Sequence, residues 1–125
     1  MTARAYDQFG PFYDSTGVAD WLGISKHALA ERVDAGTVVA CLQDDAHRTW
    51  VYPAWQFTEN RTVIPGLIEV WQILQQPAAD PWIAIMWLQA PNSALHGASV
   101  VEHLRAGGAL APALATARED AARWS

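Results

Sequence analysis

The sequence has little of what catalysis or metal binding would require. Of its 125 residues only Cys41 is a cysteine, which excludes an internal disulfide and a CxxC zinc pattern. The four histidines, His27, His47, His96 and His103, have neither i, i+4 spacing nor an HExxH arrangement. No phosphate-binding loop, dinucleotide glycine pattern or nucleophile elbow occurs. We therefore expect no enzyme activity, with no catalytic residue, metal or cofactor.

Long apolar runs and positive charge are also scarce. The longest apolar run, Pro81 to Leu88, is too short to span a bilayer, and residues 1–7 lack the apolar core of a signal peptide. These absences predict a cytoplasmic protein without membrane contact. The formal net charge is −5, and residues 1–58 hold four Lys or Arg against seven Asp or Glu, a net of −3. Because phosphate neutralisation supplies much of the affinity for DNA, any DNA contact must come from a local patch or from several copies.

Apolar residues, by contrast, are abundant. Hydrophobic residues make up 51% of the chain and charged residues 17%, so a folded core is expected rather than disorder. Seven residues are tryptophan. Tryptophan fills small cores and is also enriched where proteins meet, so both uses remain open.

The first half of the chain has the pattern of two short helices joined by a tight turn. The first helix is predicted over residues 14–22 with Ser15 or Thr16 as N-cap, and the second over residues 26–35. The turn between them begins with a glycine and ends with Ser25, which can cap the second helix. Two helices around such a turn are typical of a helix-turn-helix.

The pattern then becomes extended. Residues 37–42 and 48–52 are rich in β-formers, and the polar residues 43–47 between them predict a hairpin loop. A hairpin directly after a helix-turn-helix is a wing. After an N-terminal tail, residues 1–11, the segment 12–57 therefore resembles the winged domains of the MerR and excisionase type.

DNA contact would involve the start of the second helix and the tip of the wing. Helix N-termini in this motif enter the major groove, where backbone N–H groups can also hold phosphate. The candidate DNA-binding residues are Ser25, Lys26, His27, Arg32, His47 and Arg48. However, Glu31 and Asp34 follow His27 at i+4 and i+7, and their carboxylates would repel the DNA backbone. A winged fold that serves as a structural or protein-binding unit is the alternative.

The second half of the chain is predicted to be helical. After a connector, residues 58–64, Pro65 can open a helix that ends before Pro77. Further predicted helices are one over 80–89 opened by Asp80–Pro81, a short one opened by a Ser99–Glu102 capping box, and a last one over 110–124. We therefore expect a mostly α protein with a small β-hairpin, in which a bundle of about four helices spans residues 65–125.

One motif of this half is similar to a known family. The run from Trp87 to Gly97 reads W-L-x-x-P-N-x-x-L-x-G, and an L-x-x-G at Leu104–Gly107 and a final helix follow. This order resembles the toxin-binding domain of the Xre/MbcA/ParS antitoxins over about residues 65–125. Many members have proline after the Ser or Thr that opens the short helix, whereas this chain has Val100 there.

The resemblance implies an antitoxin of a type II toxin–antitoxin system. Such proteins bind and occlude a RES-type toxin that depletes cellular NAD, and they repress their own operon by binding its operator DNA. The motif supplies the candidate toxin-binding residues Trp87, Asn92, Leu95 and Leu104. The last helix adds Arg118, Arg123 and Trp124, residue types that often anchor interfaces, although Trp124 could equally be a frayed end.

Two other functions fit the sequence. One is a MerR- or excisionase-like DNA-binding transcriptional regulator whose helical tail only dimerises. The other is a protein-only adaptor with a helix-turn-helix that no longer binds DNA. A homodimer or a larger toxin–antitoxin assembly is expected, because two weakly binding copies gain avidity on DNA.

Overall fold

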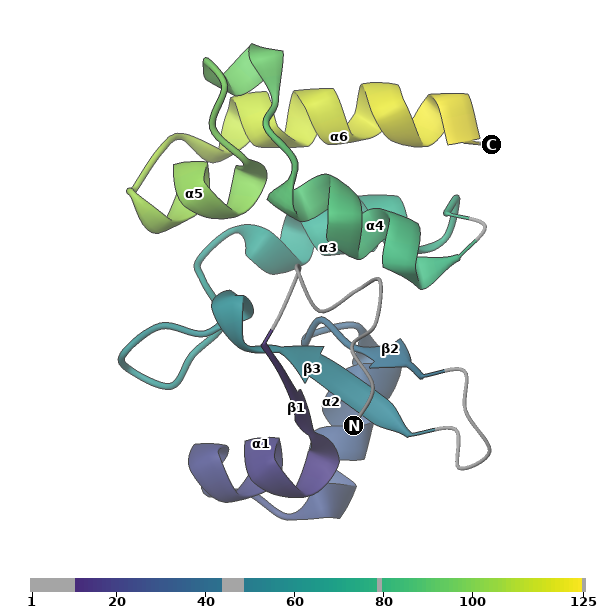
Figure 1. Ribbon diagram of the computed structural model, residues 1–125, viewed down its shortest axis with the longest axis vertical. Coiled ribbons are helices and arrows are strands. Elements are labelled where there is room, and N and C mark those ends of the chain that lie inside the picture. Colours follow the sequence, from purple (N-terminus) through teal and green to yellow (C-terminus); the bar gives the residue numbers. More distant parts are fainter. Residues whose placement is uncertain (1–10, 44–48, 79, 125) are drawn as a thin grey trace. The chain divides into compact units, whose positions relative to one another are not determined.

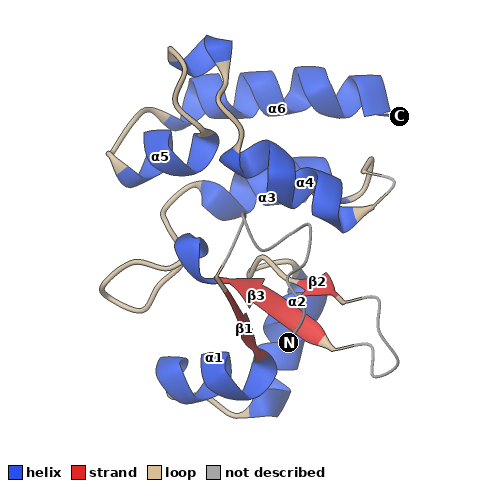
Figure 2. Cartoon of the chain, in the orientation of Figure 1, coloured by secondary structure: helices blue, strands red, loops and turns tan. Residues whose placement is uncertain are grey.

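The computed structural model describes residues 11–43, 49–78 and 80–124. The chain divides into two compact units, residues 1–62 and 63–125, which are described in turn. Helices predominate in the described residues, and one small antiparallel sheet lies in the first unit (Figure 2). This confirms the mostly α fold class. The sheet has three strands where the sequence predicted a two-stranded hairpin.

The first unit combines two helices with this sheet (Figure 1). Its elements are β1 (Phe12–Asp14), α1 (Ser15–Leu22), α2 (Lys26–Ala35), β2 (Cys41–Leu42), β3 (Trp50–Pro53) and the 3-10 helix η2 (Ala54–Gln56). The strand order is β1-β3-β2, so β3 is central. In its register Phe12 lies opposite Pro53, and Cys41 lies opposite Val51.

The turn between α1 and α2 is fixed by caps at both of its ends. Gly23 ends α1 with φ of 73°, a left-handed conformation that favours glycine. The Ser25 hydroxyl accepts the Ala28 N–H at 3.0 Å and caps α2 as predicted. The N-cap of α1 is Asp14, whose Oδ1 accepts the Gly17 N–H at 2.8 Å. The prediction of Ser15 or Thr16 as that cap was therefore wrong.

Gln56 explains why β2 is shorter than predicted. A strand was expected over residues 37–42, yet only Cys41 and Leu42 pair with β3. The fully buried Gln56 side chain takes both backbone groups of Val39: its Oε1 accepts the Val39 N–H at 2.7 Å, and its Nε2 donates to the Val39 C=O at 2.8 Å. Because the Gln56 side chain takes the place of a neighbouring strand at Val39, this residue does not pair with β3.

Tyr52 and Ser15 connect the sheet to α1. Tyr52 is buried in the core of the first unit, and its hydroxyl lies 3.0 Å from Ser15 Oγ. Burial raises the pKa of the Tyr52 phenol, and the hydrogen bond with Ser15 offsets part of that rise. The phenol is thus a neutral hydrogen-bonding group that holds the start of α1 against β3.

The elements of the second unit are all helices in its described part. Its elements are α3 (Leu67–Gln75), α4 (Pro81–Gln89), the 3-10 helix η3 (Ser93–Leu95), α5 (Val100–Arg105) and α6 (Leu110–Trp124). Helix α3 packs against α4, α5 and α6, and its face of Leu67, Val70, Trp71 and Leu74 is buried. Helix α6 turns Ala113, Ala117 and Ala121 towards this core. Their i, i+4, i+8 spacing lets the helix backbones approach closely.

The predicted helix starts of this unit are confirmed except at α3. Asp80 caps α4 by accepting the Trp82 N–H at 3.0 Å, with Pro81 as the first helical residue. Ser99 and Glu102 form the expected capping box at α5. Helix α3, however, begins after Gly66, so Pro65 precedes the helix instead of standing in its first turn.

Candidate functional sites

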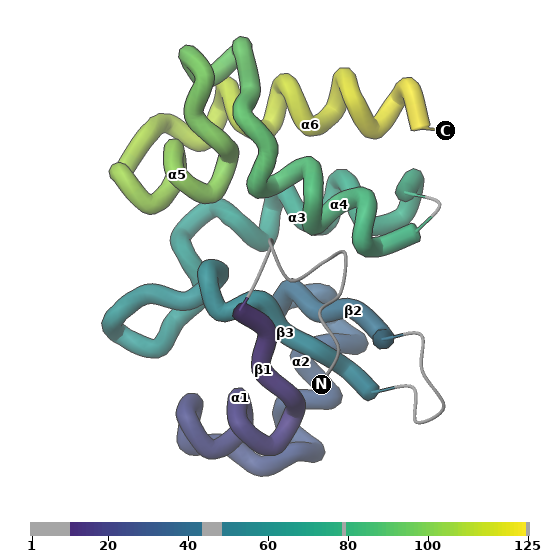
Figure 3. The backbone as a smooth tube through the Cα atoms, viewed as in Figure 1, coloured from purple at the N-terminus to yellow at the C-terminus, as the bar shows by residue number. Residues whose placement is uncertain are grey.

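The loop after α4 is closed on itself by Asn92. Its side-chain Oδ1 accepts the Ala94 N–H at 3.0 Å, and its backbone C=O accepts from Leu95 and Gly97 at 3.0 and 2.9 Å. The Asn92 N–H donates to the Ala98 C=O at 3.1 Å. An asparagine at this position thus builds the compact turn that contains η3, which lies beside α6 (Figure 3).

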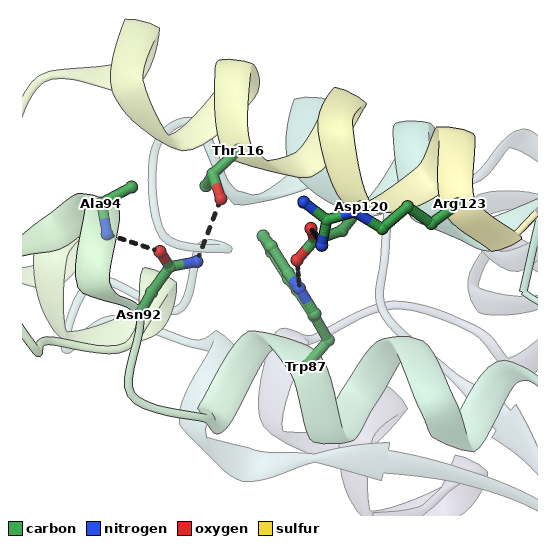
Figure 4. Close-up of polar contacts among 6 residues, drawn as sticks. All are labelled: Trp87, Asn92, Ala94, Thr116, Asp120 and Arg123. Atoms are coloured by element: carbon green, nitrogen blue, oxygen red, sulfur yellow. Dashed lines mark hydrogen bonds and ion pairs between the residues drawn. The ribbon is translucent and has the colours of Figure 1, made fainter.

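Asn92 also ties this turn to the final helix. Its Nδ2 donates to Thr116 Oγ1 at 3.3 Å, so the Asn92 amide is held at both ends (Figure 4). Thr116 is buried and lies on the side of α6 that faces η3. The motif asparagine therefore determines where the turn meets α6.

Asp120 joins α4 to the end of α6. Its Oδ2 accepts the indole N–H of Trp87 at 2.6 Å, and its Oδ1 accepts from Arg123 Nη1 at 2.8 Å (Figure 4). The Asp120 side chain is 23% exposed, whereas that of Arg123 is 72% exposed. A part-buried carboxylate with two donors is a strong polar contact, because charge-assisted hydrogen bonds gain strength away from water. The three side chains form a preorganised cluster.

A groove of about 390 Å³ opens between this cluster and the Asn92 turn. We call it the α6 groove. It is lined by Trp87, Ala90, Pro91, Asn92, Ser93, Ala94, Thr116, Glu119, Asp120 and Arg123. Its walls combine the aromatic and proline side chains with hydroxyl, amide and charged groups, a mixture that suits recognition of a polar ligand.

The α6 groove contains three of the predicted toxin-binding residues, namely Trp87, Asn92 and Arg123. The others lie elsewhere. Leu95 and Leu104 are 4% and 6% exposed and belong to the core, so they shape the unit rather than offer a contact surface.

The two remaining candidates are on α6. Arg118 is exposed but precedes Arg123 by five residues, which places it roughly 140° away around the helix. Trp124 is half-buried. The tail of α6 therefore does not present its two arginines and its tryptophan on one face.

Sequence reasoning missed Thr116, Glu119 and Asp120. A signal for them existed in the alanine stripe at positions 113, 117 and 121, which fixes the buried side of α6. With that side fixed, residues 116, 119, 120 and 123 fall on one neighbouring face at i, i+3, i+4 and i+7.

The predicted DNA-binding residues of α2 are all exposed. Ser25 uses its hydroxyl to cap the helix, so its role there is structural. Lys26 and Arg32 lie on either side of the buried Leu29, about 120° apart around the axis of α2. His27, whose side chain is 87% exposed, lies 3.3 Å from Glu31 and pairs with it when protonated. His47 and Arg48 lie outside the described residues.

Two general findings bear on the sites. Within the described residues no group of three or more His, Cys, Asp or Glu side chains is placed to hold a metal ion. Across the same residues every helix is too short or too polar to cross a membrane.

Comparison with known proteins gives a likeness to a solved structure. No family model matches the sequence, and no curated protein matches it. Among solved structures the chain is similar to the NMR structure of Rv2175c, with a TM-score of 0.63 and 23% sequence identity. The similarity covers 98% of this chain and 84% of that one. At this level of identity the likeness establishes a shared fold alone, and the shared fold includes both units.

Proposed function

We propose that this protein is a DNA-binding transcriptional regulator, in which the first unit is a winged helix-turn-helix with α2 as its recognition helix. The observation that carries the proposal is the capped α1–turn–α2 pair, followed by the β2–β3 strand pair in the order of a winged domain. Lys26 and Arg32 stand on the two flanks of α2. On a helix lying in the major groove, such flanks face the two phosphate backbones that border it.

The acidic outer face of α2 is compatible with this role. Opposite Leu29 the helix carries Glu31 and Asp34, which would face base edges rather than phosphates. Carboxylates in the major groove accept hydrogen bonds from the N4 amino group of cytosine. The net charge of −3 over residues 1–58 keeps non-specific affinity low, so two copies on a repeated site would be needed for tight binding.

Replacing Lys26 and Arg32 together by alanine tests this proposal. We expect about tenfold weaker binding to the promoter DNA of the protein's own gene and a salt-dependence slope smaller by about 2, because each lost phosphate contact removes about one unit. Mobility shifts of the full chain at several salt concentrations measure both quantities. Arg118→Ala, a charge change in the second unit, is the matched control. Equal slopes for the double variant and the wild type would contradict the assignment of α2.

A second function, capture of a toxin protein by the second unit, is favoured by the α6 groove. The motif residues Trp87 and Asn92 meet Arg123 there in a preorganised arrangement, which reduces the entropy lost on binding. Together with the resemblance to the Xre/MbcA/ParS domain, this supports an antitoxin that occludes a RES-type toxin and represses the operon encoding both proteins.

Asp120→Ala is the direct test of toxin capture. The substitution frees both Trp87 and Arg123, so we expect about tenfold weaker binding to a RES-domain toxin encoded in the same genome. Growth rescue on co-expression and affinity measured by calorimetry report the effect. Asp20→Ala, at an exposed position of α1, serves as the control. Full rescue and unchanged affinity for Asp120→Ala would remove the groove from toxin binding.

A further inference from the structure

We propose that the α6 groove receives an arginine side chain from the partner protein. The inference rests on the second function above and specifies its chemistry. It starts from the charges in the groove, which come from Glu119, Asp120 and Arg123. One Asp120 oxygen pairs with Arg123, and the other accepts the Trp87 indole N–H. The charges of Asp120 and Arg123 therefore offset each other.

Glu119 is the unbalanced charge of the groove. It is exposed at the groove wall, and its carboxylate makes no hydrogen bond or ion pair with any residue that the structure describes. Arg123 lies four residues on, the usual distance for pairing with it, yet it is held by Asp120 instead. The groove therefore offers one free anionic acceptor and favours a cationic ligand.

The other lining groups favour a guanidinium over an ammonium. The Trp87 indole and the Pro91 ring supply apolar surface to the groove wall, and the Ser93 hydroxyl, which also lines the groove, offers a second acceptor. Arginine combines a planar, weakly hydrated cation with a fork of five donors, and it packs readily against tryptophan. Lysine presents a compact, strongly hydrated charge that uses such a wall less well.

Titration of the full chain with N-acetyl-arginine amide tests this assignment. In nitrogen–proton NMR spectra the indole N–H of Trp87, identified with Trp87→Phe, and the side-chain amide of Asn92 should shift, with a dissociation constant on the order of 1 mM. N-acetyl-citrulline amide, which has the same shape without the charge, should bind at least fivefold more weakly. Glu119→Gln should weaken arginine binding to the same extent, whereas Glu69→Gln, an exposed glutamate of α3, should leave it unchanged.

Equal binding of the two amides, no shift at Trp87, or an unaffected Glu119→Gln variant would overturn the arginine assignment. These outcomes are separable from failure of toxin capture. If arginine amide fails while Asp120→Ala still loses the toxin, the groove is the partner site but takes another side chain. If arginine amide binds as expected while Asp120→Ala keeps full toxin affinity, the cation site stands and toxin capture by the groove falls.

Discussion

Replacing Gln56 by leucine should destabilise the first unit by roughly 3 kcal/mol, although leucine has a similar volume and is more apolar. The Gln56 side chain satisfies three buried backbone groups: the N–H and C=O of Val39, and the C=O of Pro53 at 3.1 Å. Leucine satisfies none of them, and each buried polar group left without a partner costs about 1–3 kcal/mol. The loss should exceed any gain from the added apolar surface.

Urea unfolding followed by circular dichroism measures this loss as a lower midpoint. Hydrogen exchange at the Val39 amide localises it, since that N–H should become one of the faster-exchanging buried amides of the unit. Gln75→Leu, at an exposed position of α3, should leave the midpoint within experimental error. A Gln56→Leu protein as stable as the wild type would mean that the segment around Val39 finds other hydrogen-bond partners.

The role of Gln56 also shows which contacts could not be predicted from the sequence. The caps at Ser25, Asp80 and Ser99 were predictable because each cap and its acceptor or donor lie within three residues of each other. Gln56 holds a backbone segment 17 residues earlier in the chain, and nothing in the local pattern distinguishes it from a surface glutamine. The same long range hid β1, whose three residues form a strand only because β3 lies beside them.

The residues of the α6 groove also divide into those that a local motif reveals and those that depend on long-range contacts. Trp87 and Asn92 were found because they belong to a local motif with a proline and a turn. Asp120 was missed because its partner Trp87 is 33 residues away, and because their meeting depends on how α6 is rotated against α4. Leu95 and Leu104, found by the same motif, proved to be core residues, because the motif contains both positions that build the turn and positions that line the groove.

Substituting Gly66 by alanine should destabilise the second unit by about 2–3 kcal/mol, through two separable causes. Gly66 precedes α3 with φ of 89°, a conformation that costs an L-residue about 1–2 kcal/mol. A Cβ there would also lie 3.0 Å from Leu110 Cδ1 and 3.5 Å from Leu104 Cδ2. The distance to Leu104 is an ordinary van der Waals contact, but the Leu110 side chain must give way by a few tenths of an ångström, which adds to the cost.

Gly97→Ala separates the two causes. Gly97 has nearly the same φ, 88°, but a Cβ there would meet nothing within 4 Å. Its substitution should therefore cost only the backbone term, about 1–2 kcal/mol, and the excess for Gly66→Ala measures the contact with Leu110. Thermal or urea unfolding of both variants gives the comparison. Equal losses would show that Leu110, the first residue of α6, rotates away freely, so that Gly66 is required by its backbone conformation alone and not by the approach of α6 to the start of α3.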